Sequence, residues 1–365
     1  MKKILRSKYI FIIPLFLLMS ISIITLYNHR NTSILYKYNY LKQLIWFIIG
    51  FFLVLLISKL NTKSIFRYSI ILYIISILLL IYCLIWGDVI NGARAWINFK
   101  FFSFQPSELM KLSLSLLLSS IAYNYKNTGI KSEIIFLSII FILTLIPSIL
   151  VYLEPDTGAI MFYLIIDLAI ISFSHIHKFW YYIIFIVISI CTTAFIYLYL
   201  YNKDLLINLI GTSIFYRVER LITFKTMNSY QLGNALIGMG SSSFMNLSLG
   251  NNRIYIPEGH TDFIFSYIVT NFGYIFSFII FILYFLIDIY LINRLLNSKD
   301  SEIKYVLGCF YLIFLFGQVI NISMNLGLLP IMGIPLPFLS YGGSTIIIYF
   351  IFLAIIFKKP YFHMT

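Results

Sequence analysis

Long runs of apolar residues, separated by short polar links, constrain this 365-residue chain more than any other feature. A transmembrane helix needs roughly 17 to 25 predominantly apolar residues. Hydrophobic residues make up 61% of the chain, and the mean hydropathy is +0.95, which excludes a soluble globular protein. We therefore predict an all-α polytopic membrane protein, built as a single integral membrane domain over residues 1–365. The runs predict about ten transmembrane helices, at residues 9–27, 41–58, 68–87, 107–123, 134–153, 158–174, 178–201, 263–292, 305–322 and 344–357.

Basic residues set the expected orientation of these helices, because Lys and Arg concentrate in the cytoplasmic loops of membrane proteins. With the N-terminus inside, fifteen Lys and Arg residues fall in inside loops and six in short outside segments. We therefore expect both termini to be cytoplasmic, and the net charge of +13 to follow mostly from topology rather than from nucleic-acid binding. The first run follows basic residues, as in a signal peptide, but its apolar core is too long and no small-residue cleavage site follows. We expect it to remain as an anchor.

One apolar segment cannot be a plain helix. Residues 321–344 carry three prolines and four glycines without a single charge. Non-helical backbone at membrane depth survives only where it is buried in protein or lines a cavity. Proline turns and close approaches at glycine then shape a site. This segment is therefore expected to hold part of a ligand or a partner.

Three further polar interruptions fall on the same outside face. They are residues 87–111, residues 154–158 and a long loop at about 202–262 between the seventh and eighth helices. The long loop is basic and amphipathic, and its Arg217 and Arg220 suit anionic lipid headgroups or diphosphates. Polar exceptions gathered on one face of a membrane protein indicate a site on that face.

Candidate residues in these interruptions also have plain structural interpretations. Glu108 and Lys111 stand three residues apart and could pair at a helix start or contact a ligand. Arg94, beside a tryptophan, could be an interfacial anchor or an anion contact. Asp262, at the mouth of a span, could be a helix N-cap or a functional carboxylate. The three cysteines and the histidines at 175 and 177 are interpreted as packing and loop residues.

Five motifs occur in order along the chain. They are Gly92-Ala93-Arg94 with Trp96, Gln105-Pro106-Ser107-Glu108 with Lys111, Pro155-Asp156 with Gly158, His260-Thr261-Asp262-Phe263-Ile264-Phe265, and Gly327-Leu328-Leu329-Pro330 through Ser340-Tyr341-Gly342-Gly343-Ser344. Each is unspecific alone, but together, at this spacing, the chain closely resembles the SEDS family (shape, elongation, division and sporulation) of bacterial peptidoglycan glycosyltransferases. The resemblance covers essentially the whole chain.

The resemblance implies an inverting polymerisation of lipid II into glycan strands at the outer face of the bacterial cytoplasmic membrane. It also implies a class B penicillin-binding protein, a transpeptidase, and other cell wall elongation proteins as partners. Asp262 matches the essential aspartate of the family and would be the catalytic base. A divalent cation, Mg²⁺ or Mn²⁺, could help to neutralise the diphosphate, and no organic cofactor is expected. The implied substrate-binding residues are Arg94, Glu108, Lys111, Asp156, Arg217, Arg220, His260, Ser340, Gly342 and Gly343.

Within the family, Pro335 is more similar to the elongation member RodA, because the division member FtsW usually carries Thr there. The chain also departs from the common pattern. A Gln usually precedes the Pro-Asp pair, where this chain has Glu154. Residues 241–246 replace a glycine-rich run, and residues 270–273 lack the acids that often precede Leu-Gly. The five motifs are intact.

Other functions stay open at this point. A lipid II flippase, a transporter, would need polar residues along a path through the bilayer, and Asp167 is the clearest acid inside a span. A scaffold that only activates its penicillin-binding partner is compatible with the altered glycine run. A division- or sporulation-type member of the same family would share the chemistry and differ in its role in the cell.

Overall fold

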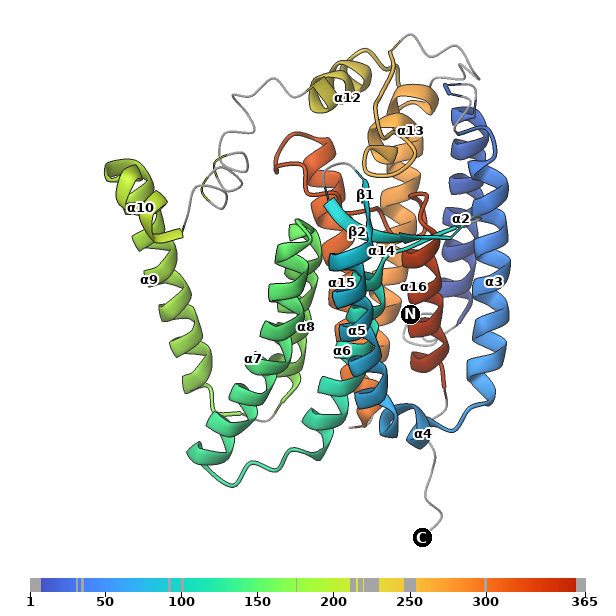
Figure 1. Cartoon of the computed structure of the whole chain (residues 1–365). Helices are drawn as coiled ribbons and strands as arrows, with labels where there is room; N and C mark the ends of the chain where they lie inside the picture. Colours follow the sequence, from blue (N-terminus) through green and yellow to red (C-terminus); the bar gives the residue numbers. More distant parts are fainter. Residues whose placement is uncertain are drawn as a thin grey trace.

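The computed structural model describes residues 8–30, 32–33, 36–90, 93–99, 102–174, 176–210, 215, 219, 230–245, 254–298 and 301–358. Short strands β1 (Asp88–Ile90), β2 (Ala93–Asn98) and β3 (Ser103–Phe104) form an antiparallel sheet in that order. All other elements are helices (Figure 1), namely α2 (Tyr9–His29), α3 (Asn39–Lys59), α4 (Thr62–Arg67), α5 (Ser69–Trp86), α6 (Pro106–Asn124), α7 (Ile130–Leu153), α8 (Thr157–Phe173), α9 (Phe179–Tyr201), α10 (Lys203–Ile210), α12 (Tyr230–Gly240), α13 (Ile264–Phe272), α14 (Tyr274–Leu296), α15 (Glu302–Asn325) and α16 (Gly343–Ile356).

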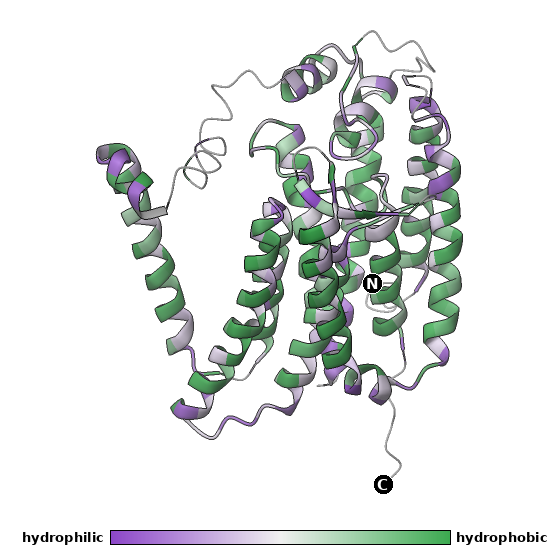
Figure 2. Ribbon diagram, viewed as in Figure 1, coloured by the Kyte–Doolittle hydropathy of each residue, from purple (hydrophilic) through white to green (hydrophobic). Residues whose placement is uncertain are grey.

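The all-α membrane fold is confirmed in its general form. Seven of the described helices are long and apolar enough to cross a membrane, and α8 and α16 are shorter apolar helices. Their middle parts are strongly hydrophobic, and polar residues collect at the ends and in the loops (Figure 2). Each expected span except one coincides with a single helix.

The exception is the span expected at residues 263–292, which was wrong as a single helix. It is divided into α13 and α14 at Gly273, whose φ of +87° lies in the left-handed region. Glycine reaches this conformation without a Cβ clash, so the chain can end one helix and begin the next without a loop. The short sheet at residues 88–104 was also not foreseen.

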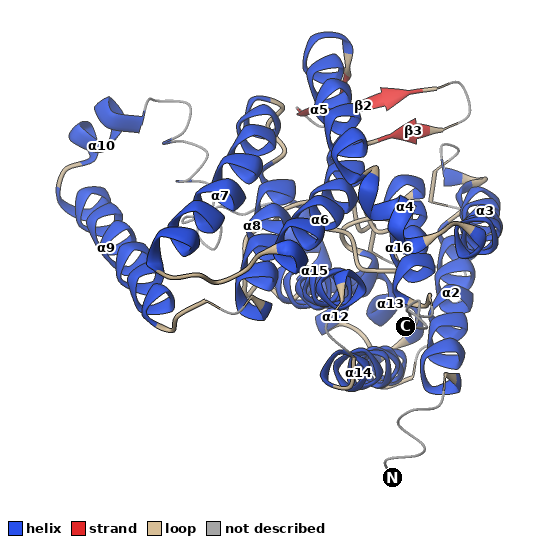
Figure 3. Ribbon diagram, turned by 90° about the horizontal axis from the view of Figure 1, so that it is seen from below, coloured by secondary structure: helices blue, strands red, loops and turns tan. Residues whose placement is uncertain are grey.

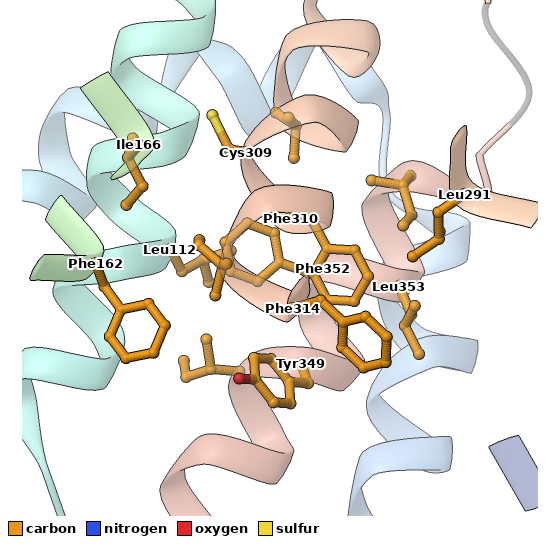
Figure 4. Close-up of a cluster of buried hydrophobic side chains, with 14 of the residues drawn as sticks. Leu112, Phe162, Ile166, Leu291, Cys309, Phe310, Phe314, Tyr349, Phe352 and Leu353 are labelled. Atoms are coloured by element: carbon orange, nitrogen blue, oxygen red, sulfur yellow. The ribbon is translucent and has the colours of Figure 1, made fainter. Parts of the chain in front are cut away.

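The core lies where α6, α8, α15 and α16 meet. Aromatic rings of α15 and α16 fill its centre, and Leu112 of α6 and Phe162 of α8 close one side (Figure 4). Phe310 packs edge-on against Tyr349 with ring centroids 6.0 Å apart, an arrangement that aromatic pairs favour. Seen along the bundle axis, α2, α3 and α14 flank this core (Figure 3). In contrast, α9 stands apart, and none of its residues is buried.

The segment between α15 and α16 is non-helical, as the sequence predicted; its first part exposes Leu326 and Leu328, and its second part, from Ile334, is mostly buried. Ile334, Leu336, Phe338 and Leu339 are each at most 2% exposed. Polar side chains of four surrounding helices donate to its backbone carbonyl oxygens, so the segment does not leave these groups unpaired at membrane depth. The donors and acceptors are Ser22 to Leu339 (2.7 Å), Gln43 to Ser340 (3.1 Å), Tyr284 to Pro337 (2.6 Å) and Asn321 to Ile334 (2.8 Å).

Candidate active site

The turn that carries Asp262 is folded tightly upon itself just before α13. The backbone carbonyl of Glu258 accepts hydrogen bonds from the amides of Thr261 (3.1 Å) and Phe263 (3.0 Å). The Thr261 hydroxyl donates to the Glu258 carboxylate at 2.8 Å. Glu258 itself adopts a φ of +53°, a conformation that is costly for a residue with a side chain and that clusters at functional sites. The turn therefore holds two carboxylates, Glu258 and Asp262, close together.

The non-helical segment fixes this turn from the other side. The Ser340 hydroxyl donates to the carbonyl of Thr261 at 2.6 Å and accepts from the amide of Leu336 at 2.8 Å. The amide of Tyr341 donates to the carbonyl of His260 at 2.9 Å. Ser340, which was expected to bind substrate, thus lies in the site and links the Asp262 turn to the non-helical segment.

Asp262 is not the N-cap of α13. The cap position is Phe263, which makes no capping bond. The amide of Ser266, in the first turn of the helix, instead donates to the side chain of Asn325 at 3.0 Å. Among the described residues, the Asp262 carboxylate has no hydrogen-bond donor, and a Cβ atom on Gly333 would lie 3.8 Å from its Oδ2 atom. The capping alternative is therefore wrong, and the carboxylate is free for another role.

The surroundings change the proton affinity of Asp262. Burial raises the pKa of Asp262 to about 7, and the negative charge of Glu258 adds to the rise. A carboxylate with a pKa near neutrality can accept a proton from a hydroxyl group and release it again at cellular pH. This is the protonation behaviour that a general base needs.

His260 lies in an aromatic cluster beside this carboxylate. Its ring centroid is 4.3 Å from that of Tyr36 and 5.4 Å from that of His29. Burial lowers the pKa of His260, although the negative charge of Glu258 opposes the shift. Among the described residues its Nδ1 atom has no hydrogen-bond partner. His260 is thus a buried member of this aromatic cluster, and its contact with substrate stays a prediction.

A second polar cluster joins the starts of α6 and α8. Asp156 caps α8 through the amide of Ala159 (3.3 Å), while its other oxygen accepts from Gln105 Nε2 (2.8 Å) and the Ser107 hydroxyl (3.0 Å). These bonds occupy both carboxylate oxygens. Asp156, predicted to bind substrate, is thus held by protein donors.

Glu108 and Lys111 form a buried ion pair one turn further into α6. Lys111 Nζ lies 2.6 Å from Glu108 Oε1, and both side chains are less than a tenth exposed. The ammonium group also lies 4.1 Å from the ring centroid of Phe162, a cation–π contact. The structure therefore contains the Glu108–Lys111 ion pair that the sequence predicted as the structural alternative. Contact with substrate stays a prediction for both residues.

Met332 and Gly333 connect the two clusters. A Cβ atom on Gly158, in the first turn of α8, would lie only 2.8 Å from the carbonyl oxygen of Met332. The next residue, Gly333, adjoins the Asp262 carboxylate and has a φ of +64°. Gly158, two residues after Asp156, and the Asp262 carboxylate thus adjoin consecutive residues of the non-helical segment.

The remaining predicted residues are placed as follows. Arg94 is exposed on β2, and its amide donates to the carbonyl of Glu154 at 3.2 Å, beside the Asp156 cluster. Gly343 begins α16, and a Cβ atom there would lie 2.5 Å from Trp46, whereas Gly342 has more room. Arg217 and Arg220 lie outside the described residues.

Sequence reasoning missed the residues that support the site. Gln105 was noted only as part of a motif, and Asn321 and Asn325 were not singled out. The available signal was two amides four residues apart inside an apolar span, since polar groups within membrane helices are usually functional. Within the described part of the chain, no three His, Cys, Asp or Glu side chains converge as metal ligands.

Comparisons with known proteins identify the family of this chain. Residues 3–362 match the FtsW, RodA and SpoVE family, which is described as cell cycle protein. A relative named "Probable peptidoglycan glycosyltransferase FtsW", from Wigglesworthia glossinidia brevipalpis, is 31% identical, over 99% of this chain and 96% of its own. The peptidoglycan glycosyltransferase MrdB of Helicobacter pylori is 30% identical, over 87% of this chain and 81% of its own.

Solved structures show the same fold. A chain from a peptidoglycan synthase complex that coordinates polymerisation and crosslinking superposes with a TM-score of 0.77 over 95% of both chains, at 21% identity. The rod shape determining protein RodA of Thermus thermophilus gives a TM-score of 0.66 over 96% of this chain and 95% of its own, at 20% identity. With a family match over almost its entire length and the same fold, this chain belongs to the FtsW, RodA and SpoVE family of multi-pass membrane proteins.

Proposed function

We propose that this protein is a peptidoglycan glycosyltransferase that polymerises lipid II into glycan strands at the outer face of the bacterial cytoplasmic membrane. The observation that carries the proposal is the Asp262 carboxylate. It accepts no hydrogen bond from the described residues, burial raises its pKa to about 7, and the non-helical segment holds the turn that carries it. Two relatives named peptidoglycan glycosyltransferase, MrdB and FtsW, support the same chemistry. Pro335 favours a role in cell elongation and shape.

Asp262 acts as the general base in a single displacement. It accepts the proton of the attacking sugar hydroxyl as that oxygen bonds to the anomeric carbon of the donor. The bond between this carbon and the diphosphate oxygen breaks, the lipid diphosphate leaves with the electron pair, and the configuration inverts. General-base catalysis contributes roughly 10² to 10⁴ in rate.

Positive charge for the departing diphosphate comes from exposed basic groups rather than from Lys111, which Glu108 already neutralises. Arg94 is exposed beside the Asp156 cluster, and the basic segment with Arg217 and Arg220 follows α10 in the chain. A divalent cation, Mg²⁺ or Mn²⁺, would have to take most of its oxygen ligands from the diphosphate, because the described residues offer few. No step depends on it.

A transport function is less consistent with the arrangement of polar groups. Asp167, the acid expected on a flippase path, accepts a hydrogen bond from Thr144 at 2.7 Å between α7 and α8. The polar motifs lie instead at one end of the bundle, around the start of α6, α8 and α13. Site residues at one surface suit a reaction on a headgroup that is already on that side.

The partner proposed is a class B penicillin-binding protein, since the structurally similar synthase complex combines polymerisation with crosslinking. Its single membrane helix would occupy a groove of about 560 Å³ between α14 and α15, which apolar residues such as Phe281, Phe285 and Ile322 line. Gln318 donates to Asp288 at 3.2 Å in the groove and would give the contact polar specificity.

A purified-enzyme assay tests the function. Wild type and Asp262→Asn, each with and without the cognate partner, are given labelled lipid II, and the glycan chains are separated by length. We expect polymer from wild type, more with the partner, and none above background from Asp262→Asn. Asp167→Asn is the matched control and should retain polymerisation. Equal activity of wild type and Asp262→Asn would exclude the proposed base. Absence of polymer in every sample, with lipid II crossing vesicle membranes, would favour a flippase.

A further inference from the structure

Two asparagines in the last turn and a half of α15 lie directly beneath the Asp262 turn. Asn321 and Asn325 are four residues apart, so their side chains lie on one face of the helix. Both are fully buried, at 0% exposure. Buried amides in an otherwise apolar membrane helix are costly unless each polar atom finds a partner. These two find their partners mainly in the turn and at the start of α13.

Both side chains donate to the same acceptor. Asn321 Nδ2 and Asn325 Nδ2 each lie 2.9 Å from the backbone carbonyl oxygen of Asp262. Asn321 also donates to the carbonyl of Ile334 at 2.8 Å, next to Gly333. The Asp262 backbone is therefore fixed at its carbonyl by two donors, and one of them also holds the segment beside the Asp262 carboxylate.

The other end of Asn325 caps α13. Its Oδ1 atom accepts from the amide of Ser266 at 3.0 Å and from the Ser266 hydroxyl at 2.6 Å. The amide hydrogen can only be donated, which fixes Oδ1 as the atom that faces it. First-turn amides of a helix usually bond to a side chain just before the helix, and Asp262 stands next to the cap position. Here Asn325, which lies on α15, accepts the hydrogen bond from the Ser266 amide of α13 instead.

We propose that Asn321 and Asn325 are positioning residues. Both hold Asp262 by its backbone carbonyl, and Asn325 also caps α13 in place of Asp262, so that the Asp262 carboxylate stays free to act as the base. The inference rests on the proposed function of Asp262. It explains why Asp262, which lies just before α13, does not make the capping hydrogen bond that its position favours. It also assigns a role to two residues that do not contact the proposed reacting atoms.

The test compares Asn325→Ala and Asn321→Ala with wild type in the lipid II polymerisation assay. Misplacing a catalytic group by about 1 Å can cost about 10²-fold in rate. We expect kcat to fall by roughly that factor in Asn325→Ala and by less in Asn321→Ala, with KM for lipid II changed less than about twofold. Asn271→Ala is the matched control. Asn271 is also buried, at 2% exposure, and lies on α13. Among the described residues its side chain donates only within its helix, to the carbonyl of Tyr267 at 2.8 Å.

A second variant separates positioning from simple loss of structure. Asn325→Asp keeps an acceptor for Ser266 but brings a carboxylate to the Asp262 turn, where Glu258 and His260 are the other titratable neighbours. Burial at this position, among the carbonyl oxygens of Asp262 and Asn321, favours the protonated carboxyl, whose single hydroxyl can replace only one of the two amide donations, so kcat should fall below that of wild type while α13 keeps its cap. Each variant must co-purify with the partner and elute as a folded protein. If Asn325→Ala does not fold, Asn325→Asp decides alone.

The possible results are distinct. Polymerisation by wild type with a kcat loss in the Asn325 variants, but not in Asn271→Ala, supports the proposal. Unchanged kcat in both alanine variants, or equal loss in Asn271→Ala, overturns it, as does a wild-type kcat in Asn325→Asp. Failure of wild type itself to polymerise lipid II would contradict the proposed function instead, and the two failures are therefore distinguishable.

Discussion

At the scale of single residues, the two carboxylates of the turn determine how activity depends on pH. A general base works only when deprotonated, so kcat/KM for lipid II should rise with pH and level off above about 7, the pKa to which burial raises Asp262. Glu258→Gln removes the like charge and should lower the pKa of Asp262, which moves the acidic limb to lower pH. The measurement is initial polymerisation rate against pH for both proteins.

One outcome of the Glu258→Gln experiment would contradict the expected shift of the acidic limb. If the limb of Glu258→Gln coincides with that of wild type, the two carboxylates do not interact, and burial alone sets the pKa of Asp262. Glu302→Gln, at the start of α15 and at the opposite end of the bundle, is the control and should leave the limb unchanged.

Glu154 should make the stability of the protein depend on pH. Its side chain is fully buried, and neither carboxylate oxygen has a hydrogen-bond partner among the described residues. Burial, with Asp156 nearby, raises the pKa of Glu154 from 4.5 to about 8. The folded state therefore keeps a proton that the unfolded chain loses above pH 4.5, so stability falls as pH rises from 4.5 to about 8.

Glu154→Gln tests this, because an amide cannot ionise. We expect its melting temperature to exceed that of wild type by an amount that grows from about pH 5 to about pH 8.5. The exposed Asp204→Asn provides the control and should show no such trend. A difference between Glu154→Gln and wild type that is constant across this range would show that Glu154 has the same proton affinity in both states.

At the scale of elements, apolar run length predicted most helices because a membrane span needs a minimum number of apolar residues. The division at Gly273 was missed because apolar residues flank it on both sides, and only the backbone conformation reveals the break. The strands at residues 88–104 are too short to show an alternating pattern. Asp262 was identified through a motif, whereas its support by Asn321 and Asn325 depends on residues about 60 positions away, which local sequence cannot bring together.

Contact between α8 and the non-helical segment leaves no room for a side chain at Gly158. A Cβ atom there would meet the backbone carbonyl of Met332 at 2.8 Å, and backbone cannot move aside as a flexible side chain can. Gly158→Ala should therefore displace residues 332–333 from Asp262 and lower kcat by about 10-fold or more. Overpacking should also cost about 1–3 kcal/mol of stability. Rates and melting temperatures of the purified variant check both effects.

Gly233→Ala is the matched control for this substitution. Gly233 lies inside α12, and a Cβ atom there would meet nothing within 4 Å. Alanine in a helix interior is favoured over glycine by about 1 kcal/mol, so this variant should be active and at least as stable as wild type. Normal kcat in Gly158→Ala would mean that the segment adjusts without moving the site.

At the scale of the whole molecule, the two ends of the bundle differ in chemistry. One end carries the Asp156 and Asp262 clusters and the sheet (Figure 1). At the other end the start of α2 meets the end of α16, where the rings of Phe11 and Phe357 lie 5.1 Å apart and Lys358 donates to the carbonyl of Leu60. Most of the described basic residues in short loops are at this second end. The bias of Lys and Arg toward the cytoplasm therefore predicts an outward-facing site.

Cysteine labelling in intact cells tests this orientation, on which access to lipid II at the outer face depends. Natural cysteines are few, and Cys191, the exposed one, lies on α9 and is first replaced by serine. Tyr230→Cys, on α12 at the site end, should then react with a membrane-impermeant thiol reagent. Thr128→Cys, exposed in the link between α6 and α7 at the other end, should react only after the cells are opened. The reverse pattern would place Asp262 in the cytoplasm, where it could not build glycan strands outside the membrane, and would overturn the proposed function together with the topology.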